Sequence, residues 1–513
     1  MIKVKTALIS VSDKTDILNI LKCLKKFNVK ILSSGGTFKK IKKLGFKSTE
    51  ISNYTNSPEI LSGRVKTLNP KIHGGILYDR NLNLHKREMN KFNYSGIDLV
   101  IVNFYPFEKV LESSNSEKKI IENIDIGGPT LVRSSAKNYK YVAVVSSQKE
   151  YKELENELLK YKGHTSEEFR KKMAHEAFIN TAYYDSKVSN YFSKLLNYKF
   201  PNKKIISATR VENLRYGENP HQEAAIYSLK DKKFINQIHG RKLSYNNYND
   251  LISALSISKT LPKNIGTVII KHANPCGVSI KEKDLESYKN ALKCDPISAF
   301  GGVVSFNFKL KKNLAIEIIK NFYEIVIADG FEKSALQMLK KKKNLRIIDS
   351  SNFVPQNTEV FNSNLGGLLI QTSDDVPFLS KDFRIVSKLK PSKKDLKELL
   401  FAFHVCKFVK SNAIVICKDL STIGIGSGQT SRLDSCEIAV NKAHKFKNNQ
   451  NNESTYAASD AFFPFTDGIE KLVVSGVTSV IQPSGSIRDR EIIKFANKSR
   501  ISLIFSKTRH FKH

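Results

Sequence analysis

Apolar and polar positions follow two alternating periods through residues 1–150. Short runs rich in β-branched residues, typical of buried strands, alternate with segments whose apolar residues recur at helical spacing. The strand-like runs are residues 6–12, 29–37, 97–107 and 141–147, and the helical segments are 14–28 and 38–46. This alternation predicts a parallel α/β layer domain. In such a sheet the ligand crevice lies outside the carboxyl ends of the strands.

The pattern changes twice along the rest of the chain. Residues 149–200 are polar and helical and predict a connecting helical region. Beyond Pro201–Ser207, strands and helices mix again without a strict internal repeat. We therefore predict the boundaries 1–148, 149–200 and 201–513, and an exposed loop in the Asn- and Lys-rich stretch near 445–454.

The charge balance restricts the class of protein. There are 84 Lys and Arg residues against 49 Asp and Glu, a formal charge of +35. A nucleic-acid-binding protein is one interpretation. However, the lysines are spread along the chain, and no zinc-finger or RNA-binding motif is present, which favours anionic small-molecule substrates instead. The densest run, Lys340–Lys343, is interpreted as a solvated helix end.

The cysteines and the N-terminus bear on location. None of the six cysteines forms a C-x-x-C pair, as expected of reduced cysteines in a cytoplasmic protein. The first residues lack the apolar core of a secretory signal, and no apolar run approaches the ~20 residues that span a bilayer. We expect a cytoplasmic protein with neither a membrane nor a nucleic-acid partner.

Gly-rich segments in the first part could hold an anion. Ser34-Gly35-Gly36-Thr37 lies between a predicted strand and a helix, where backbone N–H groups can approach a phosphate. An ordinary glycine turn is an equal alternative for this motif alone. Residues 64–67 and 124–138 add cations, an acid and a second glycine pair, which together indicate a small polyanion site.

The segment Lys271–Gly277 is the most informative part of the C-terminal region. Lys271 and His272 follow an apolar strand and precede Pro275 and Gly277, which predicts a loop. A neutral His suits general base catalysis near pH 7, and an adjacent ammonium can stabilise an oxyanion. A hydrogen-bonded structural His is the alternative.

Other motifs are less specific. Residues 215–222 combine Arg, Tyr, Gly and His, which would suit a phosphate and a planar ring or form a structured turn. The glycines Gly424, Gly426 and Gly428 lack the GxGxxG spacing, so a dinucleotide fold is excluded. Residues 460–465 could contact an aromatic ligand or belong to the core.

These segments together resemble, in order and over essentially the whole chain, the bifunctional purine-biosynthesis family, AICAR formyltransferase plus IMP cyclohydrolase. The segments are SVSDKT, SSGGT, GRVKTLNPKIHGGIL, IDIGGPTLVRSSAKN, LRYGENPHQ, IIKHANPCG, SNAIVICKD, IGIGSGQTSR, SDAFFPF, PSGSIRD and RHFKH. The resemblance implies an α/β fold with a methylglyoxal-synthase-like parallel-sheet domain, followed by two deaminase-like α/β subdomains without zinc. The zinc-deaminase motif is absent from the sequence.

The resemblance also implies two reactions. The C-terminal region would transfer a formyl group from 10-formyltetrahydrofolate, the co-substrate, to AICAR. The N-terminal domain would close the product, FAICAR, to IMP with loss of water. Neither step would use a catalytic metal. The family is a homodimer whose transferase sites are shared between subunits.

Site residues carry over by matching motifs. His272 matches the general base, and Asn412 matches a polar group near the formyl carbon. Lys271 matches the cation that stabilises the tetrahedral intermediate or aids proton transfer to the folate leaving nitrogen. The AICAR-binding positions are Arg215, Tyr216, Gly301, Glu324 and Arg432. The folate positions are Phe462, Asp467, Ser486 and Arg509. The nucleotide contacts in the N-terminal domain are Ser12, Asp13, Lys14, Ser34, Gly35, Gly36, Thr37, Arg64, Val65, Lys66, Thr67, Val102, Asn103, Asp125 and Ile126.

The acid/base group for ring closure is open among four residues. Lys137 matches the proposed group, and Lys66, Tyr105 and Asp125 are the other candidates. Ser134 and Ser135 stand where the family usually has Ala, next to Lys137. The alternative function is a catalytically inactive nucleotide-binding regulatory protein, and retention of Lys271, His272, Asn412 and Lys137 argues against it.

Overall fold

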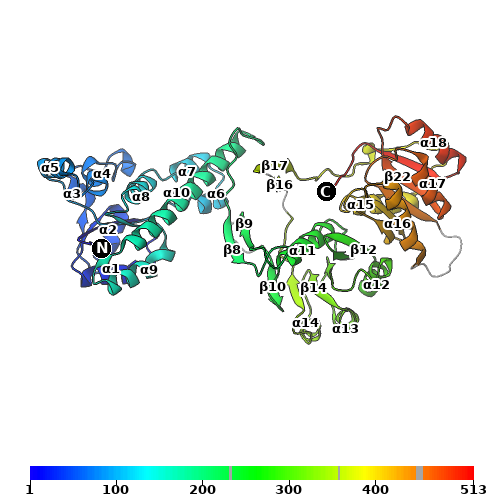
Figure 1. Cartoon of the computed structure of the whole chain (residues 1–513), viewed down its shortest axis with the longest axis horizontal. Coiled ribbons are helices and arrows are strands. Elements are labelled where there is room, and N and C mark those ends of the chain that lie inside the picture. Colours follow the sequence, from blue (N-terminus) through cyan, green and yellow to red (C-terminus); the bar gives the residue numbers. More distant parts are fainter. Residues whose placement is uncertain (230–233, 356–358, 365, 446–453) are drawn as a thin grey trace. The chain divides into compact units, whose positions relative to one another are not determined.

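The computed structural model describes residues 1–229, 234–355, 359–364, 366–445 and 454–513. The chain forms two compact units, unit 1 (Met1–Ser207) and unit 2 (Ala208–His513) (Figure 1). Most of the loop predicted near 445–454 lies outside the described residues. Within the described ranges, no helix is long and apolar enough to cross a membrane.

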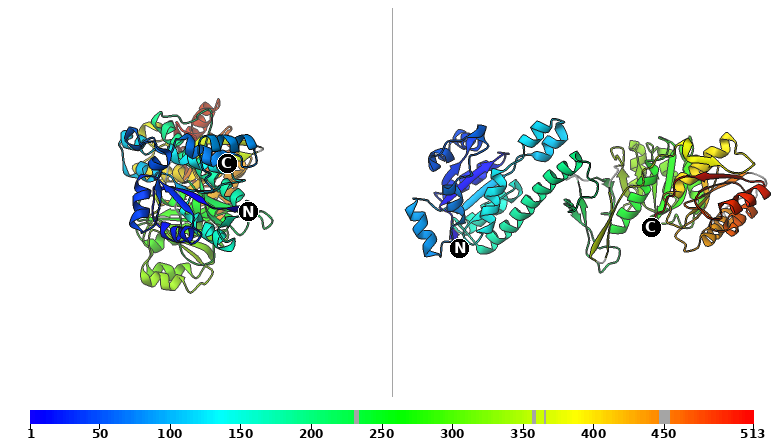
Figure 2. Two further views of the ribbon diagram at one scale, coloured as in Figure 1. Left: turned by 90° about the vertical axis from the view of Figure 1, so that its left-hand side faces the viewer. Right: turned by 90° about the horizontal axis from the view of Figure 1, so that it is seen from above.

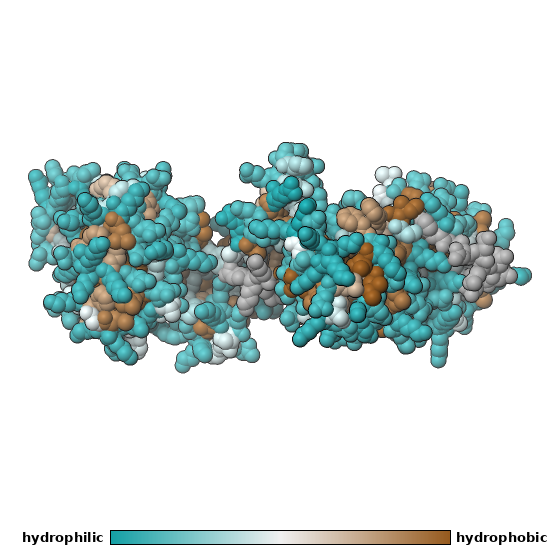
Figure 3. All heavy atoms as spheres, turned by 90° about the horizontal axis from the view of Figure 1, so that it is seen from below, coloured by the Kyte–Doolittle hydropathy of each residue, from teal (hydrophilic) through white to brown (hydrophobic). Residues whose placement is uncertain are grey.

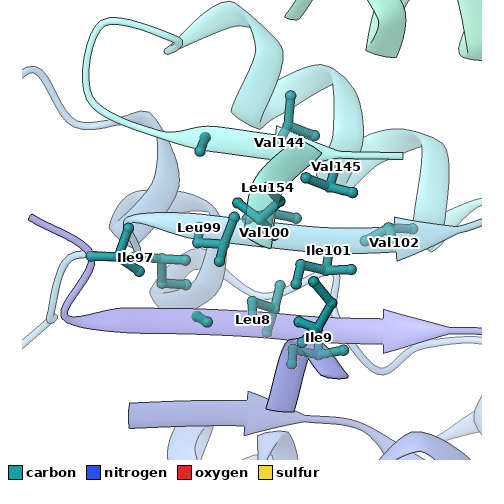
Figure 4. Packing of buried hydrophobic residues seen from close by; sticks show 14 of the residues in the cluster. Leu8, Ile9, Ile97, Leu99, Val100, Ile101, Val102, Val144, Val145 and Leu154 are labelled. Carbon is teal, nitrogen blue, oxygen red and sulfur yellow. The ribbon is translucent and has the colours of Figure 1, made fainter. Parts of the chain in front are cut away.

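Unit 1 contains a five-stranded parallel sheet in the order β4-β3-β2-β5-β6. The strands are β2 (Thr6–Val11), β3 (Lys30–Ser33), β4 (Thr49–Glu50), β5 (Leu99–Asn103) and β6 (Ala143–Val145), and β1 (Ile2–Lys3) pairs separately with β7 (His164–Thr165). The apolar residues of β2, β5 and β6 form the buried core (Figure 4). The chain order reverses between β2 and β5, which is where an open α/β sheet forms its ligand crevice.

Helices cover both faces of this sheet. They are α1 (Ile17–Lys26), α2 (Gly35–Lys43), α3 (Ile51–Thr55), α4 (Pro70–Leu77), α5 (Asn83–Lys91), α6 (Phe107–Ser113), α7 (Glu117–Glu122), α8 (Gly127–Lys137), α9 (Tyr151–Lys160) and α10 (Glu167–Leu195), with 3₁₀ turns η1 (Leu61–Gly63) and η2 (Gln148–Glu150). The predicted strand 29–37 is shorter than expected, because helix α2 already begins at Gly35.

The segment 149–200, predicted as a connecting region, belongs to unit 1. Helix α10 lies beside α8 and β6 (Figure 2). Its Met173 and Ala177 are buried in the same core cluster as the sheet. Arg170, only 2% exposed, donates hydrogen bonds to the carbonyl oxygens of Tyr139 (2.8 Å) and Lys140 (2.9 Å). The polar composition of the segment hides the stripe of small and large residues along which this helix is buried.

Unit 2 contains a twelve-stranded sheet in the order β10-β15-β14-β13-β11-β12-β20-β19-β21-β22-β23-β18. The first-half strands are β10 (Asn236–His239), β11 (Gly266–Lys271), β12 (Asn274–Ile280), β13 (Gly302–Phe306), β14 (Tyr323–Ala328) and β15 (Arg346–Asp349). The second-half strands are β18 (Phe383–Ile385), β19 (Ile414–Lys418), β20 (Ser421–Gly426), β21 (Thr455–Ser459), β22 (Val477–Pro483) and β23 (Ser502–Ser506). Two antiparallel pairs lie outside it, β8 (Thr209–Asn213) with β9 (Ala225–Ser228) and β16 (Glu359–Asn364) with β17 (Gly367–Thr372).

The two halves of this sheet repeat one element order, although the sequence shows no strict repeat. Each half runs strand, helix, hairpin, helix, strand, helix, strand, helix, strand. The pairing directions also agree, since β11 pairs with β12 and β13 as β19 pairs with β20 and β21. The helices are α11 (Tyr245–Ser258), α12 (Asp284–Cys294), α13 (Lys312–Ile318), α14 (Lys333–Leu339), α15 (Lys393–Cys406), α16 (Arg432–Lys445), α17 (Thr466–Val474) and α18 (Asp489–Lys498), with the 3₁₀ turn η3 (Ser380–Asp382). The expected pair of α/β subdomains is thus a structural repeat.

A narrow seam joins the halves. Strands β12 and β20 run antiparallel, with Ser279 opposite Ser421 and their hydroxyl oxygens 2.7 Å apart. The backbone N–H of Ile280 donates to the carbonyl oxygen of Leu420 at 2.9 Å. Behind the seam, a Cβ on Gly277 would collide with the backbone of α12, and a Cβ on Gly424 would collide with α16. These glycines therefore permit close strand–helix packing. Figure 3 shows that hydrophilic side chains cover most of the visible surface, as expected where the many lysines are solvated.

Candidate active sites

Unit 1 has a cavity of about 570 Å³ at the carboxyl ends of β2, β3 and β5. It brings together most of the residues predicted to contact a nucleotide. Those lining it are Ser12, Lys14, Ser34, Gly36, Thr37, Arg64, Lys66, Thr67, Asn103, Tyr105, Asp125 and Ile126. Val102 lies buried in β5, and Asp13, Gly35 and Val65 flank the cavity in sequence without lining it.

Two helices begin at this cavity. Helix α2 starts directly after Ser34, and α8 starts at Gly127 and Gly128. No side chain caps α2, so its first backbone N–H groups remain available to an anion. At α8, the N–H of Gly128 is already donated to the carboxylate of Asp125. Thr37 fixes the start of α2, because its hydroxyl bonds to both the N–H and the carbonyl of Val11. The geometry suits a phosphate or a developing oxyanion.

Two hydrogen bonds hold the side chain of Asp125 at the N-terminus of α8. Its carboxylate accepts from the N–H of Gly128 at 2.8 Å and of Tyr105 at 3.3 Å. Burial raises the pKa of Asp125 above its ordinary value, which favours a carboxyl group that can carry a proton. Tyr184 of α10 accepts from the N–H of Asp125 at 2.8 Å. Sequence reasoning missed Tyr184, because only the fold brings α10 to this loop.

The cations predicted for this site differ in the partners that they already have and in their distance from the cavity. Lys66 lies 3.3 Å from Glu59, and Arg64 pairs with Glu122 on the surface. Lys137 does not line the cavity. It is exposed at the last residue of α8, about 15 Å along the helix from the N-terminus that faces the cavity. The structure therefore separates Lys137 from the other acid/base candidates.

Unit 2 has a larger cavity, of about 850 Å³, beside the β11–β12 hairpin. It collects the residues predicted for catalysis and AICAR binding in the first half of the sheet. These are Arg215, Tyr216, Lys271, His272, Gly301 and Glu324. They come from well-separated parts of the sequence, so their convergence is a property of the fold.

His272 lies in a two-residue hairpin turn rather than in an open loop. His272 (φ 51°) and Ala273 (φ 58°) both adopt the left-handed conformation that such turns require. Pro275 and Gly277, expected in a loop, belong to strand β12, and an irregular register near Ile270 accommodates the proline. This tight turn presents His272 at the cavity.

Hydrogen bonds fix the residues around this turn. Lys271 donates from Nζ to the carbonyl oxygen of Phe300 at 2.7 Å. Asp250 of α11, which sequence reasoning missed, accepts from the N–H of Ala273 at 2.7 Å and lines the same cavity. Burial raises the pKa of Asp250, and the nearby charges of His272 and Lys271 oppose that rise.

Glu324 separates this cavity from a neighbouring one. It accepts from Asn247 at 2.7 Å and pairs with Arg346 at 3.3 Å. The neighbouring cavity, about 440 Å³, is lined by Arg241, Arg346 and Lys341–Lys343 among others. The lysine run predicted as a solvated helix end therefore borders a basic cavity. Charge density along the sequence gave no sign of this concave surface.

A third cavity in unit 2, of about 420 Å³, lies in the second half of the sheet. It brings together three residues predicted to contact the folate, one predicted to lie near the formyl carbon, and one predicted to bind AICAR. Those lining it are Asn412, Arg432, Phe462, Asp467 and Arg509. Ser486 is not among them and lies before α18, where its N–H donates to Asp489 at 3.2 Å. This cavity shares no lining residue with the His272 cavity.

Arg432 is buried, and three of its five N–H donors bond to neighbouring side chains. It pairs with Asp460, which is fully buried, and donates to Ser459 at 2.7 Å and to Oδ1 of Asn412 at 2.7 Å. Asn412 in turn donates from Nδ2 to the carbonyl oxygens of Gln429 (2.9 Å) and Thr430 (3.0 Å). Arg432 therefore orients Asn412, and its contact with AICAR stays a prediction.

The C-terminal tail completes this third cavity. His510, 1% exposed, bonds through Nδ1 to the carboxylate of Asp374 at 2.6 Å, and its N–H donates to the carbonyl oxygen of Asp460. The neighbouring residues Arg509 and Phe511 line the cavity. A bond from the N–H of Lys410 to Asn274 (3.1 Å) ties the segment before Asn412 to the hairpin that carries His272.

Within the described residues, no group of three or more His, Cys, Asp or Glu side chains is arranged to hold a metal ion. The six cysteines are all buried and unpaired with one another.

Two family models match successive parts of the chain, and the second begins within unit 1. Residues 16–130 match the MGS-like domain model, and residues 135–442 match the AICARFT/IMPCHase bienzyme model. The chain is 45% identical to a "Bifunctional purine biosynthesis protein PurH" of Leptospira biflexa, covering 100% of both chains. It is 43% identical to the protein of that name from Persephonella marina, covering 99% of this chain and 100% of the other. A solved structure titled "Crystal structure of ForH" is 29% identical over 37% of this chain and 97% of its own, with a TM-score of 0.34. The chain belongs to the AICARFT/IMPCHase bienzyme family.

Proposed function

We propose that unit 2 transfers a formyl group from 10-formyltetrahydrofolate to AICAR and that unit 1 closes the product, FAICAR, to IMP. The chain is a bifunctional formyltransferase and cyclohydrolase of purine biosynthesis that acts on small-molecule substrates. The observation that carries the assignment of sites is the convergence of Lys271, His272 and the AICAR-binding candidates in one cavity. The alternative of an inactive nucleotide-binding regulator is not supported, since relatives named as bifunctional enzymes match the whole chain.

In the transfer step, the amine of AICAR attacks the formyl carbon of the donor. This amine is a weak nucleophile because its lone pair is conjugated with the ring. His272 accepts the amine proton, and Lys271 stabilises the oxyanion of the tetrahedral intermediate. The carbon–nitrogen bond to the folate then breaks, and the departing folate nitrogen takes up a proton. The bond from Lys271 to Phe300 uses one of its three donors and leaves two for the intermediate.

Substrate binding divides between charged and aromatic groups. Arg215 and the basic residues around Arg346 suit the phosphate of AICAR, and Tyr216 suits its planar ring. In the third cavity, Phe462 suits the folate ring, Arg509 suits a folate carboxylate, and Asp467 can accept a hydrogen bond. Asn412 lies in the same cavity, held by Arg432, and we assign it to the formyl group.

We further propose that the enzyme is a homodimer whose transferase sites combine the His272 cavity of one subunit with the Asn412 cavity of its partner. The absence of a shared lining residue between these cavities supports this arrangement. Mixing His272→Ala with Asn412→Ala subunits should then restore about one quarter of the activity, because half of the dimers regain one intact site. No restoration in exchanged dimers would contradict shared sites.

Ring closure in unit 1 is an intramolecular attack of the carboxamide nitrogen on the formyl carbon, followed by loss of water. Orientation supplies much of the rate in such a reaction. The N-terminus of α2 is suited to hold the phosphate or the developing oxyanion. Asp125, Lys66 and Tyr105 line the cavity and are the candidates for proton transfer.

The proposal assigns no step to a metal ion. A cytoplasmic location is supported by the six buried cysteines, which form no disulfide and suit a reducing compartment.

A two-stage assay tests the whole proposal. Purified protein is given AICAR and 10-formyltetrahydrofolate, and both tetrahydrofolate and IMP are followed. We expect both products. Folded protein that forms neither contradicts the proposal, and IMP formed only from supplied FAICAR would contradict the transfer step alone.

A further inference from the structure

We propose that Asp250 is a positioning residue of the formyl-transfer site, because its carboxylate holds the His272–Ala273 turn that presents His272 to the cavity. This inference rests on the proposed transfer function of unit 2. It concerns the placement of the general base, and Asp250 itself takes no proton from the substrate in the mechanism above.

The turn needs external support. His272 and Ala273 both have positive φ, a conformation that is unfavourable for residues with a Cβ. Two-residue turns of this kind normally use Asn-Gly or Asp-Gly, and neither residue here is glycine. Oδ1 of Asp250 accepts the N–H of Ala273 at 2.7 Å. A charge-assisted bond to a backbone N–H is short and strong, so it offsets the conformational cost.

In the second half of the sheet, a carboxylate also accepts a backbone N–H of the hairpin turn. Its equivalent turn, Asp419–Leu420, also has two positive φ values, 50° and 52°. The carboxylate of Glu398 accepts the N–H of Leu420, with distances of 3.0 and 2.9 Å to its two oxygens. Asp250 is the sixth residue of α11 and Glu398 the sixth residue of α15. A carboxylate at one helix position thus holds the hairpin turn in both halves.

The two turns together distinguish support of a turn from a role in catalysis. The Asp419–Leu420 turn carries no His and belongs to no described cavity, yet it keeps the carboxylate. The carboxylate therefore serves the turn, whether or not the turn carries chemistry. In the first half, the turn bears His272 and faces the cavity, so the same bond sets the position of the general base.

The main test compares Asp250→Leu with Asp250→Asn. Leu removes the acceptor, and we expect kcat for formyl transfer to fall about 100-fold, as expected for a displaced catalytic group. The KM for AICAR should change far less. Asn keeps an acceptor oxygen and should retain kcat within about fivefold, because a neutral acceptor still holds the turn. Closure of supplied FAICAR reports on unit 1 and should not change in either variant.

A second variant keeps the test informative if Asp250→Leu folds poorly. Ala273→Gly removes the Cβ that makes the left-handed conformation costly. Combined with Asp250→Leu, it should recover a substantial part of the lost kcat. Glu398→Gln is the matched control and should leave transfer unchanged, since it retains its acceptor at the other turn.

Three results would overturn the inference. They are full kcat in Asp250→Leu, loss in Asp250→Asn equal to that in Asp250→Leu, and no recovery by Ala273→Gly. The second result would indicate that the charge of Asp250 acts on the reaction directly. Absence of transfer in the unaltered enzyme would instead contradict the proposed function, so the two failures are distinguishable.

Discussion

Arg432 donates a hydrogen bond from Nη2 to Oδ1 of Asn412 at a distance of 2.7 Å. With both Nδ2 hydrogens donated to backbone carbonyls, the Asn412 amide has one fixed orientation. Its remaining capacity is a lone pair on Oδ1. Asn412 can therefore accept a hydrogen bond from a substrate N–H group, such as the amine that receives the formyl group, and cannot donate one to an oxyanion without losing a backbone bond.

Replacing Arg432 by Met should destabilise unit 2. Asp460 would remain buried without its cation, at a cost of about 3–5 kcal/mol. Denaturant unfolding followed by circular dichroism measures this loss. Arg432→Lys keeps a charge and should lose less stability, while formyl transfer still falls because Asn412 loses its partner. An Arg432→Met variant with unchanged stability and only a raised KM for AICAR would show that Arg432 binds substrate directly.

His272→Ala should block one reaction and spare the other. Loss of a general base lowers transfer by roughly 10²–10⁴-fold, whereas closure of supplied FAICAR depends on unit 1 and should continue. Separate assays of tetrahydrofolate release and IMP formation distinguish the two. His444→Ala, an exposed position on α16, is the matched control. A parallel fall of both activities would contradict the assignment of the reactions to separate sites.

Asp125→Asn should slow ring closure, whereas Lys137→Met should leave it nearly unchanged. Asp125 lines the unit 1 cavity, and its loss should lower closure by about 100-fold if it transfers a proton. Lys137 is exposed at the far end of α8, so its loss should leave the rate within about twofold, as for a surface substitution. Steady-state closure of FAICAR measures both. If Lys137→Met is the inactive variant, the assignment of this cavity as the complete closure site is incorrect.

Gly426→Ala should destabilise the second half of unit 2. A Cβ at Gly426 would collide with the carbonyl oxygen of Ser435 in α16. The helix would have to move, at a cost of about 1–3 kcal/mol. Gly428 has a positive φ and open space around its Cα, so Gly428→Asn should be tolerated. Thermal unfolding compares the two, and equal midpoints would argue against the close packing of β20 on α16.

The stability of unit 1 should depend on pH through Glu150. Burial raises the pKa of Glu150 to about 7, from an ordinary value of 4.5. The folded state therefore binds more protons than the unfolded state between these values, and stability falls as pH rises from 4.5 to 7. The loss should be roughly 3 kcal/mol above that window. Unfolding of Glu150→Gln should lack this component, while the exposed Glu168→Gln should retain it.

Sequence patterns predicted four of the five strands of the unit 1 sheet and helices α1 and α2, because buried strands and amphipathic helices have distinct periods. They also predicted the catalytic candidates, because Lys271 and His272 stand in a distinctive segment. They could not place Arg432, since a buried ion pair and a substrate contact require the same residue type. Sequence patterns did not predict Tyr184 and Asp250, for a different reason. Each acts on a backbone N–H far away in sequence, and only the packed helix brings it there.

The repeated half-sheets give unit 2 an internal symmetry. The seam pairs β12 with its own structural equivalent, β20, in antiparallel fashion, which is the geometry of an isologous interface between two identical chains. Unit 2 thus has the form of a symmetric dimer within one chain. Because the two halves need not have the same sequence, one can carry the His272 turn while the other carries the Asn412 segment. The carboxylates of Asp250 and Glu398 occupy equivalent positions in both.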